Sequence, residues 1–154
     1  SMISYAEHDF NASTFAARTT ASTKSDMYSA ITTAIGTLRG PLHGGANEAA
    51  MYMLEQWGSL EIAEKGVRDM FSRKEKLMGF GHRVYKNGDP RNAIMKKYSK
   101  LLSEEKPLGN PMLFKVSEKV EELVVGEKKM FPNADFYAAS LYNQCSFCYH
   151  IYFC

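Results

Sequence analysis

Apolar residues recur at intervals of three or four positions along most of this chain, and this spacing restricts its fold more than any other feature. In residues 26–38 the apolar positions are Met27, Ile31, Ala34, Ile35 and Leu38. Similar stripes occupy residues 50–57, 60–71, 94–102 and 113–124, with a weaker one in residues 5–20. Such a stripe forms one face of an α-helix, and no segment keeps the period-two alternation of a strand. The sequence therefore predicts an all-α fold of about six helices with no sheet.

Start signals precede several of these stripes. Asp26 is a predicted N-cap, and Asp89-Pro90 and Asn110-Pro111 each combine an N-cap with proline at the first helical position. Gly40-Pro41 and Gly58-Ser59 separate successive helices. The boundaries of the predicted helices thus agree with their apolar periodicity.

The composition excludes several classes of protein. A length of 154 residues with 45% hydrophobic and 23% charged residues fits one globular domain with a core. The net charge of +2 indicates no nucleic-acid partner, and no apolar run approaches the roughly 20 residues of a membrane span. The N-terminus lacks a charged-then-apolar signal pattern. We expect a cytoplasmic protein, with the mitochondrial matrix as the alternative.

The three cysteines, Cys145, Cys148 and Cys154, all lie in the last ten residues. An odd number confined to one end does not form a disulfide framework, which favours a reduced, intracellular setting. Cys145 and Cys148 have the spacing of redox and zinc sites, but they lack a second ligand pair, although His150 is near. We predict no metal site.

The stretch from Met78 to Arg91 combines the parts of an anion-binding site. Gly79-Phe80-Gly81 is a loop whose backbone can approach another molecule closely, and His82 follows at once. Lys86 and Arg91 place positive charge on both sides of a helix start. A titratable donor beside such a helix start suits an anionic ligand. A loop with a solvated basic patch is the alternative for this segment alone.

His43 precedes Gly44-Gly45 and the next apolar stripe, which places its ring at a helix N-terminus. The helix dipole there disfavours the protonated ring. A neutral imidazole at this position can donate a hydrogen bond to a developing oxyanion. A simple glycine-rich turn between two helices is the alternative.

Asp135 follows a Pro-Asn turn and is flanked by the aromatic residues Phe131, Phe136 and Tyr137. Desolvation among aromatic rings raises the pKa of a carboxyl group, which suits a general base. The commoner role of an aspartate after a turn is to cap a helix, and this alternative stays open.

Four motifs, in this order, resemble the citrate synthase family. They are Glu7-His-Asp-Phe-Asn-Ala-Ser-Thr-Phe-Ala-Ala-Arg18, Gly40-Pro-Leu-His-Gly-Gly-Ala-Asn-Glu48, Gly79-Phe-Gly-His-Arg-Val-Tyr-Lys86 with Asp89-Pro-Arg91, and Phe131-Pro-Asn-Ala-Asp-Phe-Tyr137. The resemblance covers nearly everything from Tyr5 to Gln144. The segments 25–28 and 127–133 look closer to the 2-methylcitrate synthase branch.

The resemblance implies an acyltransferase that joins acetyl-CoA to oxaloacetate and hydrolyses the thioester to citrate. The methylcitrate branch uses propionyl-CoA. In either case coenzyme A enters as a thioester substrate, and no tightly bound cofactor is expected.

The resemblance also assigns roles to individual residues. Asp135 is the expected base, His43 the donor to the thioester oxygen, and His82 the group that polarises the ketone. His8 and Arg91 match residues that hold oxaloacetate carboxylates, for which the planar fork of arginine is well suited. The expected CoA contacts are Phe80, Gly81 and Lys86.

The family enzymes are much longer, and this chain resembles their central part. Residues 1–45 match the end of the large domain, with helix 26–38 at the subunit interface of a homodimer. Residues 46–144 match the small, CoA-binding domain, and residues 145–154 are an atypical aromatic and cysteine-rich tail. Further arginines for oxaloacetate are expected beyond residue 144 and are replaced here by the tail. The alternative from another class is a catalytically inactive helical interaction fragment.

Overall fold

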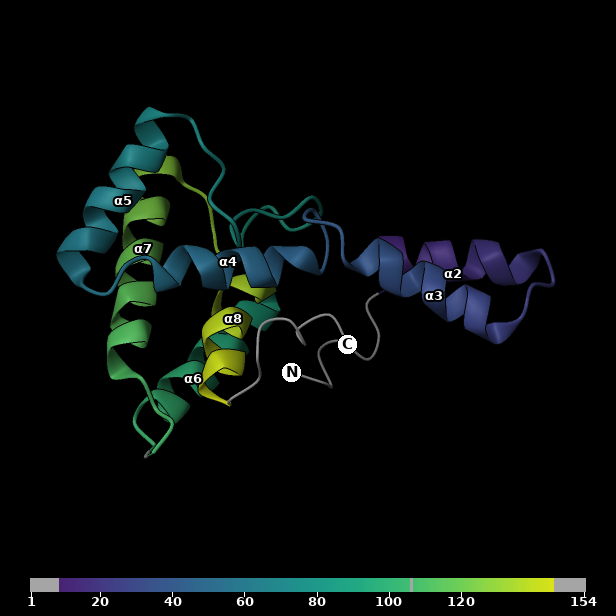
Figure 1. The fold of residues 1–154 in the computed structure, drawn as a ribbon. Helices are drawn as coiled ribbons and strands as arrows, with labels where there is room; N and C mark the ends of the chain where they lie inside the picture. Colours follow the sequence, from purple (N-terminus) through teal and green to yellow (C-terminus); the bar gives the residue numbers. More distant parts are fainter. Residues whose placement is uncertain (1–8, 106, 146–154) are drawn as a thin grey trace.

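The computed structural model describes residues 9–105 and 107–145, and α-helices dominate it (Figure 1). The described residues contain seven helices: α2 (Ala12–Ser22), α3 (Met27–Leu38), α4 (Gly45–Glu55), α5 (Leu60–Ser72), α6 (Pro90–Ser103), α7 (Pro111–Lys128) and α8 (Ala134–Gln144). The all-α prediction is confirmed. Helix α8 adds to the predicted six because it is buried on nearly every side, so no single apolar stripe marks it.

The predicted helix starts are present with their capping hydrogen bonds. The side chains of Asp26, Asp89 and Asn110 accept hydrogen bonds from the backbone N–H groups of Ser29, Arg91 and Leu113, respectively. Proline occupies the first turn of α6 and of α7, as the sequence predicts. Capping with a short polar side chain satisfies N–H groups that have no partner within the helix.

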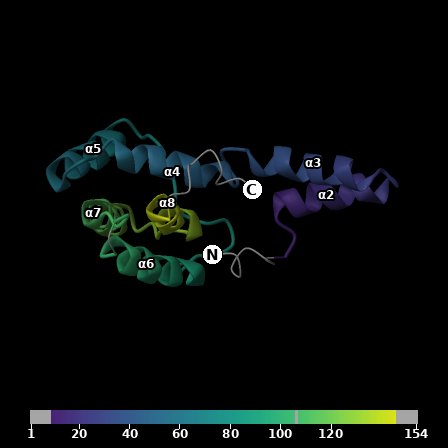
Figure 2. The same cartoon turned by 60° about the horizontal axis from the view of Figure 1, so that its bottom comes forward.

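Helices α4 to α8 form one packed body with α8 in its middle. Figure 2 shows α8 between α4 and α6, and Figure 1 shows α5 beside α7. The core draws buried apolar side chains from α4, α5, α6, α7 and α8 and from the segment between α5 and α6, among them Met51, Leu54, Val67, Phe80, Met95, Val120 and Phe136. This body carries most of the apolar area that the fold removes from water.

Helices α2 and α3 form a hairpin that projects from this body (Figure 1). Neither helix contains a buried residue. Large apolar side chains of the hairpin remain exposed, namely Phe15, Met27, Tyr28, Ile31 and Ile35. Two antiparallel helices cover only part of each other's surface, so the stripe predicted for residues 26–38 is helical but lies largely in water.

No helix within residues 9–105 and 107–145 combines the length and hydrophobicity that a bilayer crossing needs.

Two helical glycines, Gly66 on α5 and Gly126 on α7, provide a test of the packing between α5 and Trp57, which follows α4. A Cβ atom at Gly66 would stand 2.2 Å from Nε1 of Trp57, a side chain of the core, whereas one at Gly126 would meet nothing within 4 Å. We expect Gly66→Ala to lower the free energy of unfolding by about 1–3 kcal/mol through overpacking. Gly126→Ala should raise it by roughly 0.5–1 kcal/mol, since alanine loses less backbone entropy. Urea denaturation followed by far-UV circular dichroism measures both, and equal effects would contradict the packing described here.

Candidate active site

The N-terminal ends of three helices meet around the first turn of α8. The backbone N–H of Ala134 donates to Oδ2 of Asp89, the N-cap of α6, at 3.0 Å. The carbonyl oxygen of Asp135 accepts from Nδ2 of Asn47, in the first turn of α4, at 3.0 Å. The N-cap of α8 is Asn133, whose Oδ1 accepts from the N–H of Asp135 at 3.0 Å. Asp135 is therefore not the N-cap but lies in the first turn of α8.

Two loops run side by side next to this junction. The N–H of Gly81 donates to the carbonyl of Phe131 at 2.8 Å, and the N–H of Asn133 donates to the carbonyl of Gly79 at 2.9 Å. The side chain of Asn133 adds a third bond, from Nδ2 to the carbonyl of Gly81, at 2.8 Å. These contacts, with an isolated bridge between Phe80 and Pro132, hold the residue before His82 against the segment that leads into Asp135.

Glycine is required at the first position of this loop. Gly79 has a φ of +83°, and a Cβ atom there would stand 2.8 Å from the Cβ of Phe136. Gly81 has a φ of +77° but ordinary space around it. The close backbone approach predicted for this loop is thus made, at Gly79, to helix α8 of the same chain.

His82 is held by its own loop in a defined orientation. Its Nδ1 accepts hydrogen bonds from the backbone N–H groups of Val84 and Tyr85, at 3.1 and 3.2 Å. Backbone N–H groups only donate, so in the neutral ring the proton sits on Nε2. The ring packs against Tyr85 with centroids 4.6 Å apart, and the guanidinium of Arg91 lies 6.0 Å from the centroid of the same tyrosine ring.

His43 lies in the turn that leads into α4, at the helix start that the sequence predicts. Its Nε2 is 3.3 Å from the backbone nitrogen of Ser13, which donates to it, and 2.9 Å from Oγ of Ser13. The contact with the backbone N–H favours the tautomer that carries its proton on Nδ1. Partial burial lowers the pKa of His43, which keeps the ring neutral. The predicted neutral state agrees, although burial is its cause here.

The electrostatics of Asp135 follow the sequence-based expectation. Burial raises its pKa from 3.8 to about 6. The positive charge of Arg91 lowers this pKa, and the negative charge of Asp89 raises it. Of its aromatic neighbours in sequence, Phe136 and Tyr137 are fully buried, while Phe131 is exposed. A carboxylate with this pKa is ionised at neutral pH yet more basic than an ordinary aspartate.

Arg91 is paired within its own helix start. Its Nε and Nη2 donate to Oδ1 and Oδ2 of Asp89, at 3.0 and 2.7 Å. The side chain of Asp89 is 0% exposed and that of Arg91 is 19% exposed. The hydrogen bonds and the charge of Arg91, with a bond from the N–H of Ala134, hold the pKa of Asp89 below its usual range despite its burial.

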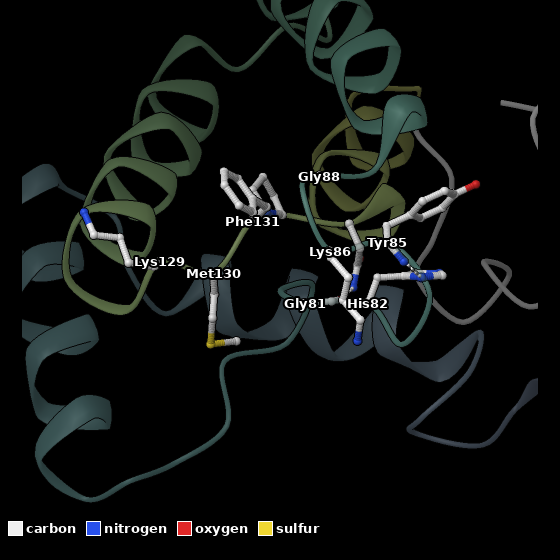
Figure 3. Close-up of a pocket in the computed structure, with 10 residues that line it drawn as sticks. Gly81, His82, Tyr85, Lys86, Gly88, Lys129, Met130 and Phe131 are labelled. Atoms are coloured by element: carbon white, nitrogen blue, oxygen red, sulfur yellow. Dashed lines mark hydrogen bonds between the residues drawn. The ribbon is translucent and has the colours of Figure 1, made fainter.

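A hollow of about 180 Å³ opens beside His82 (Figure 3). Figure 3 shows His82, Tyr85 and Lys86 on one side of it and Lys129 and Met130 on the other. Gly81 also lines the hollow, so two of the three predicted CoA contacts, Gly81 and Lys86, face it. The ring of Phe80 is 5% exposed and packs on Phe136 in the core, with ring centroids 4.6 Å apart.

The structure also involves residues that the sequence did not single out. Ser13 contacts His43, Asn47 and Asn133 hold the first turn of α8, and Lys129 lines the hollow on the side opposite Lys86. All four stand inside or beside the quoted motifs, but the partners of Ser13 and Asn47, and the partner of Nδ2 of Asn133, are distant in sequence. The predicted residue His8 lies outside the described residues. Within the described part of the chain, no group of three or more potential ligands is placed to hold a metal ion.

The raised pKa of Asp135 has a consequence for stability. A group whose pKa is about 6 in the folded state, against 3.8 ordinarily, contributes stability that is fully present below pH about 4 and is lost as the pH rises through about 6. We expect Asp135→Asn to stabilise the chain relative to the parent by roughly 1–3 kcal/mol at pH 7 and to show little difference near pH 4. Denaturation at several pH values measures this. A constant difference across the pH range would contradict a carboxyl group whose pKa is raised in the folded chain.

Comparison with known proteins places this arrangement in a family. Residues 1–154 match the family described as citrate synthase, C-terminal domain. The chain is similar to citrate synthase 2 of Bacillus subtilis, with 51% identity over 142 residues, and to 2-methylcitrate synthase of Shewanella oneidensis, with 52% identity over 143 residues. These alignments cover 92% and 93% of this chain.

A solved structure gives the same result. The chain is similar to citrate synthase from the archaeon Thermoplasma acidophilum in a ternary complex with carboxymethyl coenzyme A and oxaloacetate, with a TM-score of 0.86 and 39% identity. That match covers 96% of this chain and 40% of the archaeal one, and the chain spans 38% of the length of each of the two curated relatives. The chain belongs to the citrate synthase family.

Proposed function

We propose that this chain carries the catalytic residues of a citrate synthase, which condenses acetyl-CoA with oxaloacetate to give citrate and CoA. The observation that carries the proposal is the junction of helix N-termini around α8. It joins the segments of His43, His82 and Asp135 by hydrogen bonds made within four residues of each of them. The elements that bear the predicted base and the two predicted donors thus share one place in the fold.

Asp135 is proposed to remove the α-proton of the acyl-CoA. The α-proton of a thioester is far less acidic than a carboxylic acid, so the base has to be more basic than an ordinary aspartate and the product has to be stabilised. The pKa of about 6 supports the first requirement. The carboxylate takes the proton as the enol forms.

The two histidines are proposed to act as hydrogen-bond donors. His43, neutral and protonated on Nδ1, donates to the thioester oxygen as negative charge develops there. His82, with its Nδ1 occupied by two backbone N–H groups, presents the Nε2 proton to the ketone of oxaloacetate. The enol carbon then forms a bond to the ketone carbon as the ketone oxygen takes the Nε2 proton of His82 and the enol proton passes to His43, and water hydrolyses the thioester to release CoA.

Positive charge is proposed to bind the anionic substrates. Arg91 would hold a carboxylate of oxaloacetate, and Lys86 with Lys129 would meet the phosphates of coenzyme A in the hollow beside His82. The archaeal relative binds a coenzyme A analogue and oxaloacetate together, which supports these ligand classes. We propose residues 46–144 as the part that binds CoA.

The acyl substrate is either acetyl-CoA or propionyl-CoA. The identities to a citrate synthase and to a 2-methylcitrate synthase, 51% and 52%, do not separate the two. Propionyl-CoA, which would give 2-methylcitrate, is therefore the alternative substrate.

A chimaera tests the proposed activity. Residues 1–144 of this chain would replace the matching segment of the Shewanella enzyme, and product would be assayed with oxaloacetate and either acetyl-CoA or propionyl-CoA. We expect turnover that falls by about 10²–10⁴-fold in Asp135→Asn, because the base is lost while the shape is kept. The ratio of the two acyl substrates reports the preference.

Asp69→Asn is the matched control, since Asp69 is an exposed carboxylate on α5. It should leave turnover unchanged. The 154-residue chain alone should form little or no product, because further arginines for oxaloacetate are expected outside it. A folded but inactive chimaera, or full activity in Asp135→Asn, would contradict the proposed mechanism.

We also propose that the chain self-associates through the hairpin of α2 and α3. The exposed apolar residues of α3 lie on a helix whose small residues, Ala34 and Gly36 among them, allow close approach, and a Cβ atom at Gly36 would meet nothing within 4 Å. Leaving such surface in water costs about 25 cal/mol per Å². The same face also supports the second candidate function, an inactive helical interaction fragment.

Lysine substitutions at two isoleucines test this interface. Ile31 on α3 and Ile94 on α6 are both 50% exposed. We expect Ile31→Lys to shift the chain toward monomer in sedimentation velocity at micromolar concentration, because burying a charge in an apolar interface is unfavourable. Ile94→Lys should leave the distribution unchanged. A compact monomer for the unsubstituted chain would overturn the proposal.

A further inference from the structure

We infer that Asp89 is a positioning residue for the site: one buried carboxylate that fixes both the guanidinium of Arg91 and the first turn of α8, and so couples the proposed anion-binding residue to the proposed base. The inference rests on the proposed function of Asp135 and Arg91. It assigns to Asp89 a role beyond the helix cap that its sequence position predicts.

The hydrogen bonds of Asp89 carry this inference. Its Oδ1 accepts from the backbone N–H of Arg91 and from Nε of the same residue, both at 3.0 Å. Its Oδ2 accepts from Nη2 of Arg91 at 2.7 Å and from the N–H of Ala134 at 3.0 Å. One carboxylate thus caps the start of α6, orients a cation and receives the first N–H of α8. Its side chain is 0% exposed, so solvent does not compete with these donors.

The pairing decides how Arg91 meets a ligand. The edge of the guanidinium formed by Nε and Nη2 faces Asp89 in a two-point contact. A substrate carboxylate that binds without displacing Asp89 has to approach the outer edge of the guanidinium, formed by Nη1 and the second N–H of Nη2. Because Ala134 shares the same carboxylate, the direction of that edge is tied to the position of Asp135, the next residue along α8.

Charge around Asp135 supports the same coupling. Helix α6 contributes Asp89, which raises the pKa of Asp135, and Arg91, which lowers it. Helix α4 contributes the neutral carboxamide of Asn47. On α7, Glu118 and Glu121 pair with Lys96, and Glu121 also accepts a hydrogen bond from the hydroxyl of Tyr137. By offsetting Arg91, Asp89 allows a cation to bind an anionic substrate without making the neighbouring base too weak.

A double-mutant cycle tests the inference on the 154-residue chain. The variants are Asp89→Asn, Arg91→Gln and both together, and the measurement is an NMR titration of the Asp135 side-chain carboxyl carbon. Asparagine keeps the shape and capping ability of residue 89 but removes its charge. We expect the pKa of Asp135 to fall by about one unit in Asp89→Asn, because Arg91 then acts unopposed.

Arg91→Gln and the double variant show whether Asp89 acts on Asp135 through Arg91 or only stabilises the fold. Arg91→Gln should raise the pKa of Asp135, and Asp89→Asn should change that pKa by at least about half a unit less in the Arg91→Gln background than in the parent, because part of its effect acts through the position of Arg91. Equal effects of Asp89→Asn in the two backgrounds would mean that the two charges act independently, and this result or an unchanged pKa in Arg91→Gln would overturn the inference. If Asp89→Asn does not fold, as judged by circular dichroism, Arg91→Gln alone still decides between a rise and no change.

This experiment is independent of catalysis. It uses no substrate, so an inactive chimaera would contradict the proposed function and leave the coupling between Asp89, Arg91 and Asp135 intact. If the chimaera is active but the titration shows no coupling, the proposed function stands and the role inferred for Asp89 is wrong.

Discussion

Burial of helix α8 is the constraint on which the rest of the body depends. Eight of its eleven residues are buried, including the aromatic rings of Phe136 and Tyr137. A helix enclosed in this way cannot satisfy its terminal N–H groups with water, so the protein has to supply acceptors. Asp89 and Asn133 supply them, and Asn47 donates to the carbonyl of Asp135. The same hydrogen bonds therefore satisfy the start of the enclosed helix and hold the residues of the proposed site in place.

The site keeps opposite charges close together in a partly buried place. Asp135 is raised in pKa by burial, and Arg91 stands near enough to lower it. An arginine that acted alone would lower the pKa of Asp135 and favour a weaker base, while a second carboxylate that acted alone would raise that pKa further. The buried ion pair of Asp89 and Arg91 places both influences at the start of α6. A carboxylate base beside an anionic substrate needs both influences, because the cation that binds the substrate also lowers the pKa of the base.

The two parts of the chain differ in how they are stabilised. The body of α4 to α8 buries a continuous core, whereas the hairpin of α2 and α3 has no buried residue. The hairpin nevertheless reaches the site, because Ser13 at the start of α2 contacts the ring of His43. The orientation of a proposed catalytic histidine is therefore held from a segment that has little core of its own.

The sequence by itself determined the helices, their starts and the identity of the motifs. Asp26, Asp89 and Asn110 cap helices as predicted, because capping depends on residues next to one another in the chain. Only the tertiary structure decided which side chains meet. The pairing of Ser13 with His43, of Asn47 with Asp135 and of Asp89 with Ala134 joins residues 30, 88 and 45 positions apart. It also decided that Phe80 belongs to the core and that Asn133, not Asp135, caps α8. Such contacts depend on how helices cross, and helix crossing is set by packing of whole faces, which local sequence patterns do not encode.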